Sequence, residues 1–195
     1  MPSFASLQGL KVVSLEQAVA APLCTQRLVQ AGAEVIKIER PQGDFARYYD
    51  AAVAGESSYF VWLNAGKKSV ALDLREATDK SALLQIIQSS DVLVQNLKPG
   101  SLAGLGVDLD LLHAQRPEFI SLSISGFSPD GPGHKRKAYD LLMQAESGLA
   151  QITGSAHEPG RVGVSIVDIA TGQFAYEAIL EALLARNVAS TSSQP

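Results

Sequence analysis

Basic side chains in one glycine- and proline-rich segment of this sequence could bind an anion. Lys135, Arg136 and Lys137 end the segment GFSPDGPGHKRK at residues 126–137. Because Lys and Arg bind phosphate through charge-assisted hydrogen bonds, such a cluster can form a phosphate site. Composition alone favours a simpler interpretation, in which these side chains belong to a solvated loop.

One aspartate, Asp168, stands between the run VGVSIV at residues 162–167 and a long helical pattern. An aspartate at the start of a helix usually accepts hydrogen bonds from free backbone N–H groups, which stabilises the helix by roughly 1 kcal/mol. From its position alone, Asp168 is therefore interpreted as a helix cap.

The common nucleotide-binding motifs are absent from the sequence. Where a dinucleotide site would place G-x-G-x-x-G, after the first expected strand, residues 15–22 read LEQAVAAP. The pattern G-x-x-x-x-G-K-[ST] does not occur either. These absences argue against hydride transfer with a nicotinamide cofactor and against phosphoryl transfer.

The histidines and the single cysteine do not indicate a metal site. His113, His134 and His157 are widely spaced, and we expect solvated side chains. Cys24 is the only cysteine, which excludes an intramolecular disulfide and a thiolate zinc cage. It lies on an apolar helical stripe, so we expect a small buried side chain in a reducing compartment.

Composition indicates a globular protein. Of the 195 residues, 46% are hydrophobic and 18% are charged, which suits one packed domain. The net charge of −4 argues against a nucleic-acid partner, because neutralising phosphates needs a basic surface. No run reaches the ~20 apolar residues of a membrane span, and residues 1–9 lack the features of a secretory signal. We therefore expect a cytoplasmic protein.

Strand and helix patterns alternate along the chain and predict an α/β fold, a Rossmann-like parallel sheet with helices on both faces. Strands are expected at residues 11–15, 34–39, 69–73, 91–95 and 119–125. Helices are expected at residues 21–31, 57–65, 78–89, 109–116, 139–147 and 168–186. Ligands of such sheets bind beyond the carboxyl ends of the strands, which places chemistry in the loops after those strands.

Several blocks, in this order, resemble the class III CoA-transferase family, which includes formyl-CoA transferases and succinyl-CoA:mesaconate CoA-transferases. They are AAPLCT at 20–25, GAEVIKIERP at 32–41, NAGKKSVALDL at 64–74, DVLVQNLKPG at 91–100, SGF at 125–127, AYD at 138–140 and VGVSIVD at 162–168. The resemblance extends from about residue 10 to residue 186. It implies that residues 1–186 form the N-terminal, CoA-binding part of the family's large domain.

The resemblance also implies an activity, which is transfer of CoA from an acyl-CoA thioester to a free carboxylic acid. In this family an aspartate attacks the thioester and forms an aspartyl anhydride, and returning CoA then forms an aspartyl-CoA thioester. Asp168 occupies the position of that nucleophile. Acyl-CoA is then a substrate, no metal is required, and full-length members form homodimers.

By the same resemblance, a set of positions matches the CoA contacts of the family. They are Val19, Ala20, Arg40, Leu72, Asp73, Leu74, Arg75, Asn96, Leu97, Lys98, Arg136, Lys137, Ala138 and Tyr139. Gly104 stands where family members place an arginine shortly after the N-x-x-P-G block, so one phosphate contact is either missing or supplied by Lys98. The blocks around residues 16–18 and 139–142 look closest to members that use short dicarboxylates such as succinyl-CoA. Arg47 or Lys67 is expected to hold the second carboxylate.

Two other interpretations remain open. Related α-methylacyl-CoA racemases use a histidine as a base at the position of Tyr139, and a phenol is a poor base at neutral pH, so transfer is favoured. Family members are longer than this chain, and the Ser- and Thr-rich residues 187–195 have no apolar period, which predicts a disordered tail. A truncated, inactive CoA-binding remnant is therefore the third interpretation.

Overall fold

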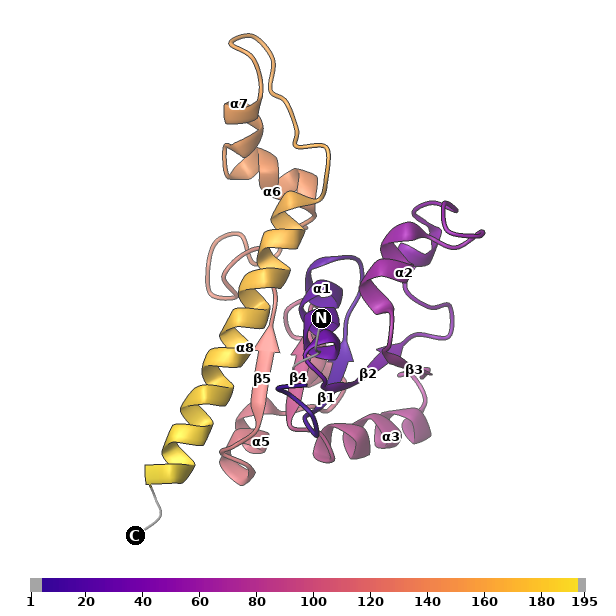
Figure 1. The fold of residues 1–195 in the computed structure, drawn as a ribbon, viewed down its shortest axis with the longest axis vertical. Helices are drawn as coiled ribbons and strands as arrows, with labels where there is room; N and C mark the ends of the chain where they lie inside the picture. The colour runs from indigo at the N-terminus through magenta and orange to yellow at the C-terminus, as the bar shows by residue number, and fades with distance from the viewer. Residues whose placement is uncertain (1–4, 193–195) are drawn as a thin grey trace.

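A five-stranded parallel sheet forms the centre of the molecule (Figure 1). The computed structural model describes residues 5–192, with side chains described as far as residue 188. The strands are β1 (Lys11–Leu15), β2 (Glu34–Glu39), β3 (Lys68–Ala71), β4 (Val92–Gln95) and β5 (Ile120–Ser123). Their order is β3-β2-β1-β4-β5, so the direction of winding reverses at β1 and both neighbours of β1 pair with it in parallel.

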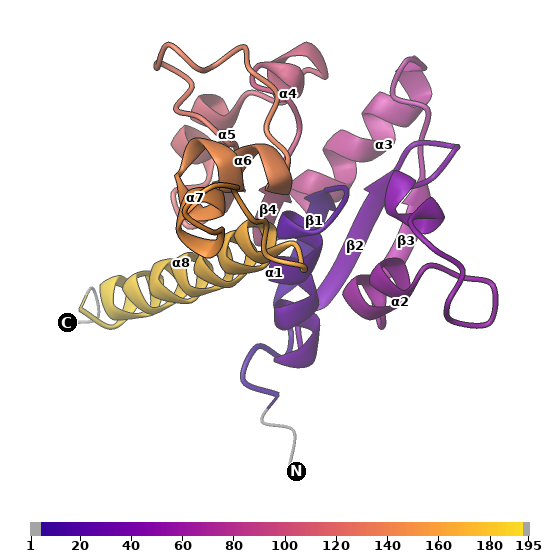
Figure 2. The same cartoon turned by 90° about the horizontal axis from the view of Figure 1, so that it is seen from above.

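Helices cover both faces of the sheet. They are α1 (Ala20–Gln30), the 3₁₀ helix η1 (Phe45–Tyr48), α2 (Ser58–Asn64), α3 (Ala77–Gln88), α4 (Ser101–Gly104), α5 (Leu109–Gln115), α6 (Asp140–Glu146), α7 (Leu149–Thr153) and α8 (Ile166–Ser192). Seen from above, α3 and α5 lie on one side of the sheet and α1, α2 and α8 lie on the other (Figure 2).

Each face of the sheet has its own apolar core. On the α1 and α8 side, Cys24, Leu28 and Ile179 pack with Val12 and Val92 of the strands. On the other side the core is formed by buried residues from the strands, α3 and α4, among them Val13, Leu93, Leu83, Ile87 and Leu102. Central strands that are buried on both faces are typical of a parallel sheet.

The first turn along the chain shows how local sequence determines the fold. Helix α1 ends at Gln30, and Gly32, just beyond the capping residue Ala31, has a φ of 101°, in the left-handed region that favours glycine. The Ala33 N–H donates to the Leu28 carbonyl at 3.0 Å, which closes the end of the helix and directs the chain into β2. The helix predicted at residues 21–31 agrees with α1 to within one residue at each end, and the predicted burial of Cys24 is confirmed.

The predicted α/β class and the parallel sheet are confirmed, with differences at two places. The sequence patterns missed the short elements η1, α4 and α7, because one helical turn is too short to show a period. The long helix begins at Ile166 and continues to Ser192, whereas the sequence predicted a helix from Asp168 and an unstructured segment from Asn187 to Pro195. Residues 193–195 lie outside the described part, and a domain boundary at residue 186 stays a prediction.

Candidate functional site

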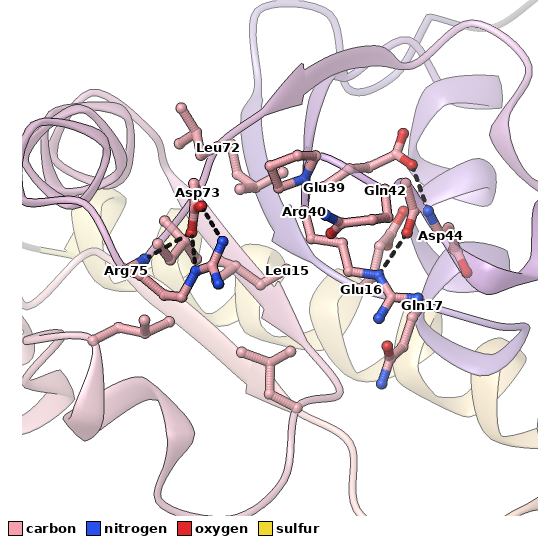
Figure 3. Close-up of a pocket in the computed structure, with 16 residues that line it drawn as sticks. Leu15, Glu16, Gln17, Glu39, Arg40, Gln42, Asp44, Leu72, Asp73 and Arg75 are labelled. Carbon is pink, nitrogen blue, oxygen red and sulfur yellow. Dashed lines mark hydrogen bonds and ion pairs between the residues drawn. The ribbon is translucent and has the colours of Figure 1, made fainter.

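A cleft of about 450 Å³ opens at the carboxyl ends of the strands. Its walls come from the segments that follow β1, β2 and β3, and Leu97 and Leu105 close it on the β4 side. Figure 3 shows Arg75 and Asp73 on one wall, opposite Arg40 and Glu39. The cleft therefore lies at the edge where the strand order of the sheet predicts a ligand.

Some of the predicted CoA contacts meet in this cleft and others do not. Six of them line it: Arg40, Leu72, Asp73, Leu74, Arg75 and Leu97. The remaining eight are not among its lining residues: Val19, Ala20, Asn96, Lys98, Arg136, Lys137, Ala138 and Tyr139. The predicted contacts that follow β2 and β3 therefore line the cleft, whereas those in the loop at residues 136–139 do not.

The cations of the cleft already have partners in the protein. The Arg75 guanidinium contacts the Asp73 carboxylate at 2.5 Å, and this hydrogen bond lowers the pKa of Asp73 to about 2. Arg40 donates through Nε to the carbonyl of Gly43 at 2.9 Å, which leaves its terminal nitrogens available for a ligand. A bound phosphate would have to compete with Asp73 for Arg75.

The turn at residues 16–19 lies between the cleft and the start of α1. Ala18 has a φ of 65°, a conformation that L side chains rarely adopt. Asn96 holds the turn from β4, because its side chain accepts from the Gln17 N–H at 3.0 Å and donates to the Gln17 carbonyl at 2.8 Å. Asp44 holds it from the other side and accepts from the Ala18 N–H at 3.2 Å. Asn96 thus supports the turn rather than lining the cleft.

Beneath this turn lie two buried ion pairs that the sequence patterns did not reveal. Lys37 contacts Asp44 at 2.7 Å, and Lys67 contacts Glu16 at 2.7 Å. The Asn64 side-chain oxygen accepts from both lysines, at 2.9 and 3.2 Å, and so joins the pairs. Burial lowers the pKa of Lys67, and the charge of Glu16 opposes that effect.

The two residues expected to hold a substrate carboxylate serve inside the fold instead. The Lys67 side chain is only 2% exposed and is saturated by Glu16, Asn64 and the carbonyl of Pro22. Arg47 forms two hydrogen bonds with Glu39, at 2.8 and 3.2 Å. Although burial raises the pKa of Glu39, hydrogen bonds from Arg47, Ser69 and the Asp44 N–H hold it at about 2. Lys67 is thus buried and saturated within the protein, and Arg47, whose side chain is 33% exposed, is already paired with Glu39.

Asp168 lies in the first turn of α8, which begins at the same edge of the sheet (Figure 1). The Asp140 carboxylate accepts from the backbone N–H groups of Val167 and Asp168, at 2.8 and 3.2 Å. Asp140 is in turn bonded to Gln144, whose side-chain oxygen accepts from the Val162 N–H at 2.8 Å. Asp168 is therefore not the helix cap, because the helix starts two residues earlier and Asp140 satisfies those N–H groups.

The carboxyl group of Asp168 is therefore not used as a helix cap, and its ionisation differs from that of an ordinary aspartate. Burial, together with the neighbouring negative charge of Asp140, raises its pKa to about 6. Tyr49 lies close enough that the charges of Asp44, Asp168 and Tyr139 add to the effect of burial and raise its pKa to about 12. A half-buried carboxylate near Tyr49, at a ligand edge, is a suitable nucleophile or base.

The basic loop is organised around one ion pair. Arg136 bonds to the Glu146 carboxylate, and its guanidinium lies 4.9 Å from the centre of the Phe127 ring. Lys137 and Lys98 are exposed. His134 and His157 are exposed as expected, whereas His113 is half-buried and lies 3.1 Å from the Ser121 hydroxyl.

Neither a metal cluster nor a membrane-spanning helix is found in the part of the chain that the structure describes. Within residues 5–192, no three His, Cys, Asp or Glu side chains gather where they could hold a metal ion. In that same range, none of the helices combines the length and apolar character needed to cross a bilayer.

The fold and the cleft define a doubly wound α/β domain with its ligand edge at the carboxyl ends of the strands. The chain belongs to CoA-transferase family III, whose family model matches residues 7–192. Its relatives include an acyl-CoA transferase of Fusarium pseudograminearum, 37% identical over 93% of this chain and 42% of the relative. The human succinyl-CoA:glutarate CoA-transferase is 36% identical over 94% of this chain and 43% of the relative.

Solved structures agree with this assignment. A CAIB/BAIF family protein from Brucella suis has a TM-score of 0.87 and 36% identity, covering 94% of this chain and 50% of that one. A hypothetical protein from Mycobacterium tuberculosis has a TM-score of 0.85 and 34% identity, covering 92% and 51%. The chain thus spans about half the length of the proteins that it matches.

Proposed function

We propose that this protein takes part in CoA transfer, moving CoA from an acyl-CoA thioester to a free carboxylic acid with Asp168 as the nucleophile. The observation that carries the proposal is the shared location of two features. Six predicted CoA contacts line one cleft at the carboxyl edge of the sheet. Helix α8, which carries Asp168, begins at that same edge.

The proposed reaction has balanced steps. The Asp168 carboxylate attacks the thioester carbonyl, a C–O bond forms, the C–S bond breaks, and CoA leaves as a thiolate. The thiolate then attacks the aspartyl carbonyl of the anhydride, which releases the donor acid and leaves an aspartyl-CoA thioester. The acceptor carboxylate attacks that thioester, which forms a new anhydride and releases CoA thiolate. The thiolate finally attacks the acceptor carbonyl of this anhydride, which gives the acceptor acyl-CoA and regenerates the Asp168 carboxylate. Covalent catalysis divides one difficult exchange into easier steps.

The ionisation of Asp168 supports this role. A pKa of about 6 leaves the carboxylate mostly ionised at neutral pH and more basic than an ordinary aspartate. Partial burial removes water that would otherwise hydrate the anion and weaken it as a nucleophile. The phenol of Tyr49 lies near enough to Asp168 for their charges to interact, and a phenolic O–H can donate a hydrogen bond to an oxyanion.

The substrate part of the proposal is a short dicarboxylate, with succinyl-CoA as the donor. Relatives of this chain are named for glutarate, oxalate and mesaconate as acceptors. Lys67 is buried in its pair with Glu16, so it does not hold the second carboxylate, and Arg47 would have to exchange its pairing with Glu39 to do so. We also propose that the protein is cytoplasmic and that it forms a homodimer.

Trapping the intermediate tests the proposed function directly. The protein is incubated with succinyl-CoA, and the peptide containing Asp168 is analysed by mass spectrometry before and after hydroxylamine. We expect a hydroxylamine-labile addition of CoA to Asp168, and no addition in the Asp168→Asn and Asp168→Ser variants. CoA trapped on another carboxylate, or full exchange by the Asn variant, would overturn the assignment.

The same preparation separates the competing activities. Exchange of CoA onto glutarate, oxalate or mesaconate indicates a transferase. Uptake of solvent deuterium at the α-carbon of an α-methylacyl-CoA indicates a racemase. Binding of CoA with neither reaction indicates a protein that binds CoA without catalysis.

A further inference from the structure

Helix α8 makes an unusually close contact with α1 at Gly172. A Cβ atom added to Gly172 would lie 2.5 Å from the Ala20 carbonyl oxygen and 2.9 Å from the Leu23 Cβ. The φ of Gly172 is not positive, so its backbone conformation does not require glycine. Glycine is also a poor helix former. What this position requires is therefore space for the backbone of α1.

This contact lies one helical turn from Asp168. Residues four apart lie on the same face of a helix, so Asp168 and Gly172 both face the start of α1. Ile169, the residue after Asp168, packs against the cluster formed by Val19, Leu23 and Leu63. The beginning of α8 and the turn that leads into α1 thus meet along one short interface.

Two separate sets of hydrogen bonds hold the two sides of this interface, which are the turn and the start of α8. Asn96 and Asp44 hold the turn through the backbone of Gln17 and Ala18. Asp140 holds the start of α8 through the N–H groups of Val167 and Asp168. Neither set links the turn to α8. Their separation is therefore set by packing between α1 and α8, which includes the close contact at Gly172, the contact of Ile169 beside it, and the core residues Cys24, Leu28 and Ile179 further along the two helices.

We propose that Gly172 is a positioning residue that sets the distance between the Asp168 carboxyl group and the turn at residues 16–19. The inference rests on the proposed function, in which Asp168 carries the acyl group, and on the family resemblance, which implies that Val19 and Ala20 contact CoA. The Cβ of an alanine at position 172 pushes α8 away from α1 and moves Asp168 out of line with the bound thioester. A displacement of about 1 Å can lower a reaction rate about 100-fold.

The test compares Gly172→Ala with Gly163→Ala. Gly163 precedes the same helix, its φ is not positive, and a Cβ there would meet nothing within 4 Å. For Gly172→Ala we expect kcat of CoA exchange to fall about 100-fold and the Kd for CoA to change less than 3-fold. The cleft after β2 and β3 does not involve α8 and should keep its affinity. Gly163→Ala should retain both constants.

A measurement without ligand makes the result independent of activity. Methyl NOEs between Ile169 and Leu23 report the contact between α8 and α1 in the folded protein. We expect these NOEs to weaken in Gly172→Ala and to persist in Gly163→Ala. NOEs unchanged in Gly172→Ala would overturn the positioning role, and so would a lower Tm with kcat intact, which is the result of a purely structural role. Failure of the wild type to exchange or bind CoA would overturn the proposed function and the catalytic purpose of the contact with it, even if the NOEs weaken as expected.

Discussion

At the scale of single residues, Asp168 is placed at a cost to stability. Burial and the Asp140 charge both disfavour its ionised form, and together they raise its pKa well above that of an ordinary aspartate, to about 6. The folded state therefore holds this proton more tightly than the unfolded chain does. The contribution of Asp168 to stability falls as the pH rises from about 4 through 6, because ionisation is harder in the folded state.

Replacing Asp168 with Asn should therefore stabilise the protein above pH 6. We expect Asp168→Asn to raise the free energy of unfolding by about 1–2 kcal/mol at pH 8, after allowance for partial exposure of the carboxyl group, and to change it little at pH 4. Urea unfolding at the two pH values measures the difference. Asp110→Asn is the matched control, since Asp110 is an exposed carboxylate in the first turn of α5. An equal gain at both pH values would contradict the assigned pKa.

The exposed Lys137 gives a second prediction at this scale. If Lys137 contacts a phosphate of CoA, as the family resemblance implies, Lys137→Ala should weaken CoA binding by roughly 1–3 kcal/mol through loss of a charge-assisted hydrogen bond. Titration calorimetry measures the affinity. The neighbouring Lys135→Ala removes the same charge from the same exposed loop and should change it little. Equal losses in the two variants would indicate a general effect of charge.

At the scale of elements, one buried ion pair connects strand β2 to the neighbouring loop and turn. Lys37 and Asp44 each have a side chain only 1% exposed, and their contact joins β2 to the loop that precedes η1. Asp44 also accepts from the N–H groups of Ala18 and Ala46. Its charge thus holds together the turn beside the cleft and the loop that forms one of its walls.

Removing one member of this pair should be far more costly than removing a surface pair. Lys37→Met leaves the Asp44 carboxylate buried without its cation, and we expect a loss of about 3–5 kcal/mol in the free energy of unfolding. Lys68→Met breaks the exposed pair with Glu34 on the adjacent strand, and we expect a much smaller loss, because solvent already screens an exposed pair. Urea unfolding compares the two variants. Similar losses would show that the buried pair contributes little.

These pairs also show where sequence patterns fail. The strands and the α/β class could be predicted because their signals are local: apolar runs, helical periods and a glycine at a helix end. Lys67 and Glu16, in contrast, lie 51 residues apart, and only the folded chain reveals that each neutralises the other. The same reason explains the mistaken helix cap, since Asp140 reaches the start of α8 from 27 residues away. Six of the residues that line the cleft were predicted, and only through family resemblance, because no local motif distinguishes them.

At the scale of the whole molecule, the outer surface of α8 remains apolar in places. Ala175, Ile179 and Leu183 of this helix are buried in the core. Phe174 and Leu184 are 69% and 64% exposed, and Ile152 of α7 is 82% exposed. Large apolar side chains gathered on one exposed helix are typical of a surface that associates with another.

This surface predicts self-association of the 195-residue chain. We expect sedimentation velocity to show species larger than a monomer at micromolar concentration, together with binding of a dye specific for exposed apolar surface. The double variant Phe174→Ser and Leu184→Ser should reduce both signals, because it removes apolar area without touching the core side of α8. Leu111→Ser, at a 54% exposed position on α5 across the sheet, is the matched control and should leave both unchanged. A monomeric wild type that binds no dye would contradict the prediction, and an equal effect of Leu111→Ser would assign the association to general surface hydrophobicity instead of α8.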